Sequence, residues 1–155
     1  MNIETRSGLS GVHPIVLFVG ALIAALVVSR ILGQPGLPLS GAFERGIGVI
    51  GLLLGGAIVS AAAARFRDEG VDPWRGEPRL VSDGVYARSR NPMLLGLAIA
   101  YLGAAIFLDS MVSVLALIPL MLVVEREVVE TEERLLEARF GERYRLYRDN
   151  VRRWF

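Results

Sequence analysis

The chain has 155 residues, of which 53% are hydrophobic, and a formal net charge of +1. This length is typical of one domain, and the hydrophobic share is high for a soluble protein of that size. Without cysteine the chain has no disulfide, thiol nucleophile or thiolate metal site, its single histidine argues against a conventional metal centre, and its near-neutral charge argues against a general nucleic-acid binder.

Four long runs without a charged residue organise the sequence. They comprise 16, 19, 18 and 15 residues, at 14–29, 46–64, 91–108 and 110–124. A bilayer-spanning helix needs about 20 mainly apolar residues, and a long side chain such as Arg30 can extend a run by snorkelling. We therefore predict an all-α polytopic membrane protein that forms a single integral membrane domain over residues 1–155. The predicted spans cover about 14–32, 46–65, 92–108 and 110–126.

The first two runs carry little chemistry. The run at 14–29 has no clean basic segment before it and no small-residue cleavage site after it, so we expect it to stay as a span. In the second run, Gly51 and Gly55 form a small-xxx-small pair, which lets two helix backbones approach closely. We expect this pair to pack within the chain rather than to form a homodimer seam.

The basic residues, all 17 of them arginine, predict the orientation in the membrane. Six lie in 65–90 and eight in 126–153, whereas the short connection at Asp109 has none. Cytoplasmic segments of membrane proteins carry an excess of Lys and Arg. We therefore expect the loop at 66–91, the C-terminal helices at 127–155 and both termini to face the cytoplasm, in the inner membrane of a prokaryotic cell.

An arginine-rich loop turns abruptly into the third apolar run. Asn91 is a favoured helix N-cap residue, and Pro92 suits the first helical position. The N-terminus of the predicted helix then lies beside Tyr86, Arg88 and Arg90. Its amides and positive dipole end, together with the arginines, favour an anionic or polar group at a membrane surface.

Beyond the fourth run, the pattern predicts that one helix continues from the bilayer into the cytoplasm. The apolar residues that recur there close to helical spacing are Val124, Val128, Leu135 and Phe140. Gly141 is a natural helix stop. A second short helix at about 142–149 would place Tyr144 and Tyr147 on one face.

Two separated segments together resemble a family of membrane enzymes. The first matches the signature G-x-Y-x-x-x-R-[HN]-P-x-Y-x-G through Leu80, Val81, Gly84, Tyr86, Arg90, Asn91, Pro92, Met93 and Gly96. The second matches E-E-x-x-L-x-x-x-F-G-x-x-Y-x-x-Y through Glu132, Glu133, Leu136, Phe140, Gly141, Tyr144, Tyr147 and Val151. In this order around a helical hairpin, the pair resembles the membrane-embedded methyltransferases typified by isoprenylcysteine carboxyl methyltransferase, whose relatives include the phospholipid N-methyltransferases. The resemblance covers about 80–153, and it departs from the usual residues at Asn91, often histidine, and at Leu94, usually tyrosine.

The resemblance implies an enzyme that binds S-adenosylmethionine at the cytoplasmic end of the last two spans, under a lid of C-terminal helices. The acceptor is expected to be a lipid-borne or hydrophobic molecule with a carboxylate or amine nucleophile, and neither a metal nor a nucleic acid is expected to take part. The expected catalytic residues are Arg90, Glu133 and Tyr86. The expected cofactor-binding residues are Arg90, Asn91, Pro92, Met93, Gly96, Glu132, Glu133, Tyr144 and Tyr147.

Elementary chemistry suggests a role for several of these side chains. Arg90 and the amides after Asn91 can bind the carboxylate of the cofactor, while Glu132 or Glu133 can meet its ammonium group or a ribose hydroxyl. Aromatic faces of Tyr86, Tyr144 or Tyr147 can lie beside the sulfonium. An amine acceptor must first lose a proton, for which Glu132, Glu133 and Tyr86 are the candidates.

Simpler interpretations remain open. Tyr144 and Tyr147 could pack and anchor an interfacial helix, as Trp74 could in the loop, and Arg88 could bind lipid headgroups. A second enzyme class is the NADPH-dependent membrane reductase of the steroid-reductase-like type, whose signature usually has Asn-Tyr-x-Gly-Glu after the proline. This chain has no Glu after Gly96, which favours the methyltransferase. A non-enzymatic membrane protein that retains the fold is the third possibility.

Overall fold

The computed structural model describes residues 13–39, 41–70 and 79–155, and within these ranges it contains helices and no strand. The elements are α1 (Pro14–Ile31), α2 (Gly41–Asp68), the single 3₁₀ turn η1 (Gly84–Ala87), α3 (Pro92–Phe107), α4 (Met111–Val123), the π-helical segment η2 (Val124–Val129), α5 (Glu130–Phe140) and α6 (Glu142–Asn150). The predicted all-α class is therefore confirmed for the part of the chain that is described. Trp74 lies outside the described residues.

Two of the described helices are long and apolar enough to cross a membrane, by length and composition. They are α1 with 18 residues and α2 with 28, while α3 is a shorter apolar helix of 16. The outer faces of α1 and α2 expose large apolar side chains, among them Ile23 and Leu53, and an apolar face of this extent is stabilised by contact with lipid or a partner. The spans at α3 and α4 remain predictions.

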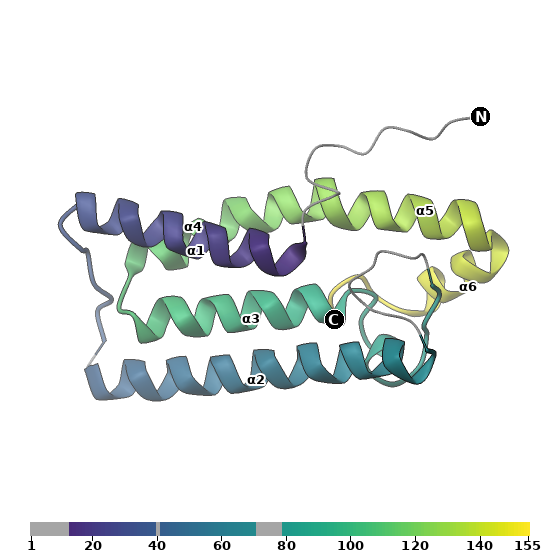
Figure 1. Cartoon of the computed structure of the whole chain (residues 1–155), viewed down its shortest axis with the longest axis horizontal. Helices are drawn as coiled ribbons and strands as arrows, with labels where there is room; N and C mark the ends of the chain where they lie inside the picture. Colours follow the sequence, from purple (N-terminus) through teal and green to yellow (C-terminus); the bar gives the residue numbers. More distant parts are fainter. Residues whose placement is uncertain (1–12, 40, 71–78) are drawn as a thin grey trace.

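Helix α3 lies beside α2 along its whole length, and the longer α2 extends beyond it (Figure 1). Glycines allow this close approach: a Cβ atom added at Gly55 would lie 2.5 Å from the carbonyl oxygen of Gly96, and one at Gly51 would lie 2.8 Å from the Cα of Gly103. Contacts this short leave no room for a side chain. The predicted packing of Gly51 and Gly55 within the chain is thus confirmed.

The connection between α1 and α2 meets the connection between α3 and α4 at one end of the bundle. The Asp109 carboxylate accepts a hydrogen bond from the backbone N–H of Leu37 at 2.6 Å, and the N–H of Met111 donates to the carbonyl of Pro35 at 3.1 Å. Ser110 caps α4 by accepting from the N–H of Ser113. The short connection predicted at Asp109 is therefore present, and it lies beside the connection between α1 and α2.

Helix α4 continues through η2 into α5, so the predicted helix from the apolar region into the charged region is confirmed (Figure 1). The π-helical geometry of η2 was not predicted. Gly141, with a φ of 54°, separates α5 from α6, because glycine adopts this backbone conformation without strain. From α6 the chain returns to the start of α3, where the N–H of Arg90 donates to the carbonyl of Arg152 at 2.9 Å.

Candidate functional site

The C-terminal segment is held against the turn that precedes α3. Ser89 Oγ and Asn91 Nδ2 both donate hydrogen bonds to the carbonyl of Arg153, at 3.2 and 3.3 Å. Ser89 Oγ also accepts from the N–H of Asn91. These contacts join two segments more than sixty residues apart in the sequence.

This arrangement corrects the predicted role of the Asn91 side chain. Asn91 occupies the N-cap position of α3 and Pro92 the first helical position, as predicted, but the Asn91 side chain makes no capping hydrogen bond. Its amide group instead donates to the Arg153 carbonyl. A capping bond would use the amide oxygen as acceptor, whereas the side chain is oriented so that its nitrogen supplies the donor that the carbonyl of the returning chain requires.

Arg90 lies at the centre of the site. Its Nη1 atom is 3.0 Å from Glu133 Oε1, and the exposed fractions of the two side chains are 11% and 15%. The same Nη1 donates to the hydroxyl of Tyr144 at 3.4 Å. Arg90 Nε is buried and has no hydrogen-bond partner among the described residues. The structure thus brings three predicted site residues together and leaves the buried Nε donor of Arg90 unused.

Arg153 binds the other side of the Glu133 carboxylate. Its Nε and Nη2 atoms donate to Glu133 Oε1 and Oε2 at 3.1 and 2.8 Å, and its Nη1 donates to Glu125 Oε1 at 2.6 Å. The hydrogen bonds that Arg153 donates to Glu133, followed by the one that it donates to Glu125, raise its pKa. Sequence reasoning missed Arg153 and Glu125, and the spacing between them contains no motif that could have revealed the pairing.

Tyr86 and Tyr147 form a second linked pair. The hydroxyl of Tyr147 donates to the backbone carbonyl of Tyr86 at 2.7 Å, and the Tyr86 ring packs edge-on against Phe66, with 5.6 Å between ring centroids. Burial is the largest cause that raises the pKa of each tyrosine, and the Glu132 carboxylate adds to it in both. Both hydroxyls therefore stay protonated at neutral pH, which makes them poor general bases.

Glu132 differs from its neighbour Glu133 because it has no hydrogen-bond or ion-pair partner among the described residues. Its side chain is exposed to solvent. Partial desolvation of the carboxyl group, and then the Glu133 carboxylate, raise the pKa of Glu132. An unpaired carboxyl group with a raised pKa is suited to accept a proton or to bind a cation.

Three other predicted cofactor-binding residues pack against hydrophobic neighbours or helix α2. Pro92 is buried at the start of α3, and Met93 packs against a cluster that contains Ala62 and Tyr86. Gly96 faces the carbonyl of Gly55 on α2. Their positions are explained by packing. The same holds for Leu94, the departure from the family signature, which is buried in the main hydrophobic core.

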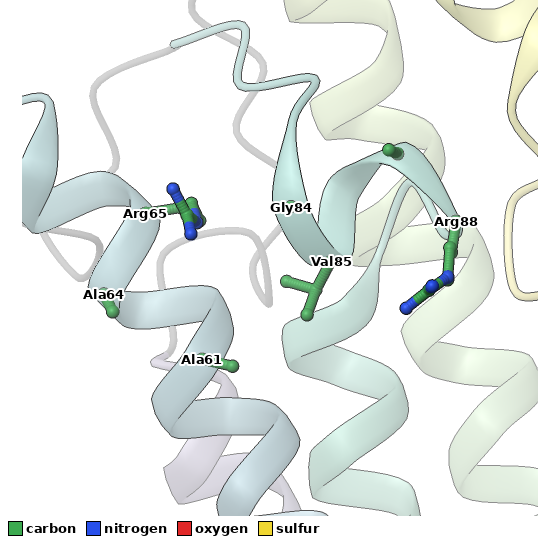
Figure 2. A pocket seen from close by; sticks show the side chains of 7 residues that line it. Ala61, Ala64, Arg65, Gly84, Val85 and Arg88 are labelled. Atoms are coloured by element: carbon green, nitrogen blue, oxygen red, sulfur yellow. The ribbon is translucent and has the colours of Figure 1, made fainter.

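An open groove of about 460 Å³ lies between the C-terminal end of α2 and η1 (Figure 2). It is lined by Ala61, Ala64, Arg65, Gly84, Val85, Ala87 and Arg88. Figure 2 shows Arg65 and Arg88 on opposite sides of it, with Val85 between them. The Arg65 guanidinium lies 3.4 Å from the Asp83 carboxylate, whereas Arg88 has no ion pair within the described ranges. The groove thus combines an apolar floor with one uncompensated cation.

Comparison with known proteins identifies the family of the chain. A family model described as phospholipid methyltransferase matches residues 44–143. The chain is also 36% identical over 62 residues to an uncharacterized protein of Haemophilus influenzae (strain Rd), a match that covers 40% of this chain and 98% of that protein. No solved structure matches the chain. The family match includes Arg90, Glu132 and Glu133 and extends over more than half of the sequence, so the chain belongs to the phospholipid methyltransferase family.

Proposed function

We propose that the protein transfers a methyl group from S-adenosylmethionine to a carboxylate or amine on a lipid-borne or hydrophobic acceptor, at the cytoplasmic face of a membrane. Family membership supports a methyltransferase that acts on lipids. The observation that carries the proposal is the polar cluster at the start of α3. There Arg90 has an unused buried donor, and an unpaired Glu132 adjoins the arginine-bound Glu133.

The residues of this cluster fit the cofactor. A guanidinium with a spare donor can bind the carboxylate of the methionine part, and Glu132 is available for its ammonium group or for a ribose hydroxyl. The partly buried ring of Tyr147 can lie beside a sulfonium. Tyr144 is only 1% exposed, so we assign it to holding Arg90. When bound, the cofactor supplies a methyl group that its sulfonium has already activated.

The protein then has to hold donor and acceptor in line and exclude water, which can contribute about 7–11 kcal/mol to lowering the barrier. A carboxylate acceptor needs no base. For an amine acceptor we assign the base to Glu132, because the oxygens of Glu133 are occupied by Arg90 and Arg153. Tyr86 keeps its proton, since burial raises its pKa, and is assigned to orienting neighbours.

We assign the headgroup of the acceptor to the groove beside α2. It adjoins a helix long and apolar enough to cross a membrane, and its apolar floor lies between Arg65 and Arg88. An anionic headgroup would meet the unpaired Arg88 there. Arg88→Gln is therefore expected to raise the KM for a lipid acceptor more than it lowers kcat. The control is Arg67→Gln, because Arg67 is exposed and lies in the last turn of α2 without lining the groove. This control is expected to change neither KM nor kcat.

A methyl-transfer assay tests the proposal. The purified protein is reconstituted in nanodiscs of defined lipids and incubated with methyl-tritiated S-adenosylmethionine, and the lipids are then separated and counted. We expect label in one lipid class, strongly reduced transfer in Glu132→Gln if the acceptor is an amine, and wild-type transfer in Glu142→Gln, an exposed control. Absence of label from every lipid and from added hydrophobic acids and amines would contradict the proposal.

A further inference from the structure

We infer that Arg153 is a positioning residue of the cofactor site: it fixes the Glu133 carboxylate and, through it, the guanidinium of Arg90. The inference rests on the proposed function, because the site it serves is the one assigned to the cofactor. Neither of the two motifs that carry the resemblance includes Arg153, and the matched range ends at residue 143. The geometry alone points to it.

The contact between Arg153 and Glu133 has the form of a two-pronged clamp. Two guanidinium nitrogens donate to the two carboxylate oxygens at 3.1 and 2.8 Å. Paired hydrogen bonds of this kind fix the orientation of both planar groups, which a single bond does not. Glu133 Oε1, which accepts from Arg153 Nε, also lies 3.0 Å from Arg90 Nη1, so the two arginines share this oxygen. The position of Arg90 is therefore set by a carboxylate that Arg153 has already oriented.

Arg153 is itself held from three directions. Glu125, on the π-helical segment η2, accepts from Nη1 at 2.6 Å. The backbone carbonyl of Arg153 accepts from Ser89 and Asn91, which immediately flank Arg90. The next residue, Trp154, packs against the main hydrophobic core. Because Arg153 is held both at its guanidinium group and at its backbone, its side chain has little conformational freedom. It can therefore fix the orientation of the Glu133 carboxylate.

The surroundings distinguish this pair from the ordinary surface ion pairs of the chain. Arg145 binds Glu137 at 2.8 Å, but the Arg145 side chain is 60% exposed, and exposed pairs contribute little. Glu133 is 15% exposed and connects two arginines. Removal of one arginine would leave a partly buried carboxylate underbonded and free to pull Arg90 into a new position.

The test uses Arg153→Gln, Arg153→Lys, Glu133→Gln and the double variant Arg153→Gln/Glu133→Gln, with Arg152→Gln as the matched control. Arg152 is exposed and contributes its backbone carbonyl rather than its side chain to Arg90. Isothermal titration with S-adenosylhomocysteine measures affinity, and thermal unfolding is recorded in parallel. We expect Arg153→Gln to weaken binding about tenfold and Arg153→Lys to restore it in part. The double variant should bind no more weakly than Glu133→Gln alone, because Arg153 acts through Glu133.

Two results would overturn the inference. In one, Arg153→Gln lowers the unfolding temperature but binds as tightly as wild type. In the other, the effects of the two substitutions on affinity add. If wild type does not bind S-adenosylhomocysteine, the proposed function fails separately, and the inference is decided by hydrogen exchange in the ligand-free protein. Arg153→Gln must then speed exchange in the first turn of α3 and around Tyr144, and exchange equal to that of Arg152→Gln would reject it.

Discussion

Arg90 Nη1 lies 3.0 Å from Glu133 Oε1, so two residues that were expected to hold opposite charges of a zwitterionic cofactor form an ion pair with each other. Because Arg153 also binds Glu133, both oxygens of this carboxylate are occupied by arginines, and it can bind a new cation only after rearrangement. Glu132 is the carboxylate that remains able to accept a proton or bind a cation. The adjacent pair of glutamates thus divides into one that organises the site and one that remains available to a ligand.

The hydrogen bond from Asn91 to the Arg153 carbonyl gives a test of the corrected role of Asn91. Asn91→Asp keeps the size of the side chain but removes the donor, so we expect a loss of about 1–3 kcal/mol of stability in detergent. Asn150→Asp removes a similar bond at an exposed position and should cost less. If the side chain capped α3, Asp would be as good as Asn, and an unchanged stability of Asn91→Asp would contradict the tether.

The glycine contact between α2 and α3 predicts a sharp difference between neighbours. An added Cβ at Gly55 would lie 2.5 Å from backbone atoms of α3, whereas at Gly56 it would meet nothing within 4 Å. We expect Gly55→Ala to destabilise the protein by about 1–3 kcal/mol and Gly56→Ala to stabilise it by about 0.5–1 kcal/mol. Thermal unfolding of both variants measures this, and equal effects would argue against the packing.

The raised pKa of Glu132 predicts that replacing this residue with glutamine stabilises the protein in a pH-dependent way. The pKa of Glu132 is raised from the ordinary value of 4.5, first by desolvation and then by Glu133, so the folded protein holds this proton more tightly than the unfolded chain. The resulting stabilisation is complete below pH 4.5 and is lost as pH rises through the folded pKa. Glu132→Gln should therefore unfold at a higher temperature than wild type near neutral pH, and the difference should vanish in acid.

The matched comparison for that experiment is Glu133→Gln. This substitution removes the charge that binds Arg90 and Arg153, so it should lower the unfolding temperature near neutral pH. A loss of stability in Glu132→Gln at neutral pH, similar to that of Glu133→Gln, would show that Glu132 has a stabilising partner and would contradict its assignment as the available carboxylate.

The predicted orientation can be measured because the natural chain has no cysteine. Leu39 and Arg143 are exposed, and they lie in the connection after α1 and in α6. With an impermeant maleimide on spheroplasts, we expect Leu39→Cys to be labelled and Arg143→Cys to be protected until the membrane is opened. Labelling of Arg143→Cys in sealed spheroplasts would place the site on the other face.

Local patterns were sufficient to predict the helices. Apolar periodicity and turn residues predicted the continuous passage from α4 into α5, the short connection at Asp109 and the stop at Gly141. The small-xxx-small spacing correctly predicted a close backbone contact at Gly51 and Gly55. These features depend on residues near one another in the sequence or on the periodicity of a single helix.

The links within the site could be predicted only in part. The two signatures placed Arg90, Glu133 and Tyr144 in one region, but the partner of each side chain depends on how α6 and the last residues fold back. Arg153 is 20 residues from Glu133 along the chain, a separation with no periodic signature. Asn91 had two possible partners, and the presence of the Arg153 carbonyl decided between them.

The most direct test of the account is titration of the purified wild-type protein in detergent with S-adenosylhomocysteine, followed by Arg90→Ala and Glu133→Ala. We predict saturable binding to one site in wild type and its loss in both variants, because Arg90 and the carboxylate that holds it form the core of the site. Folded wild-type protein that binds NADPH, and not S-adenosylhomocysteine, would contradict the account.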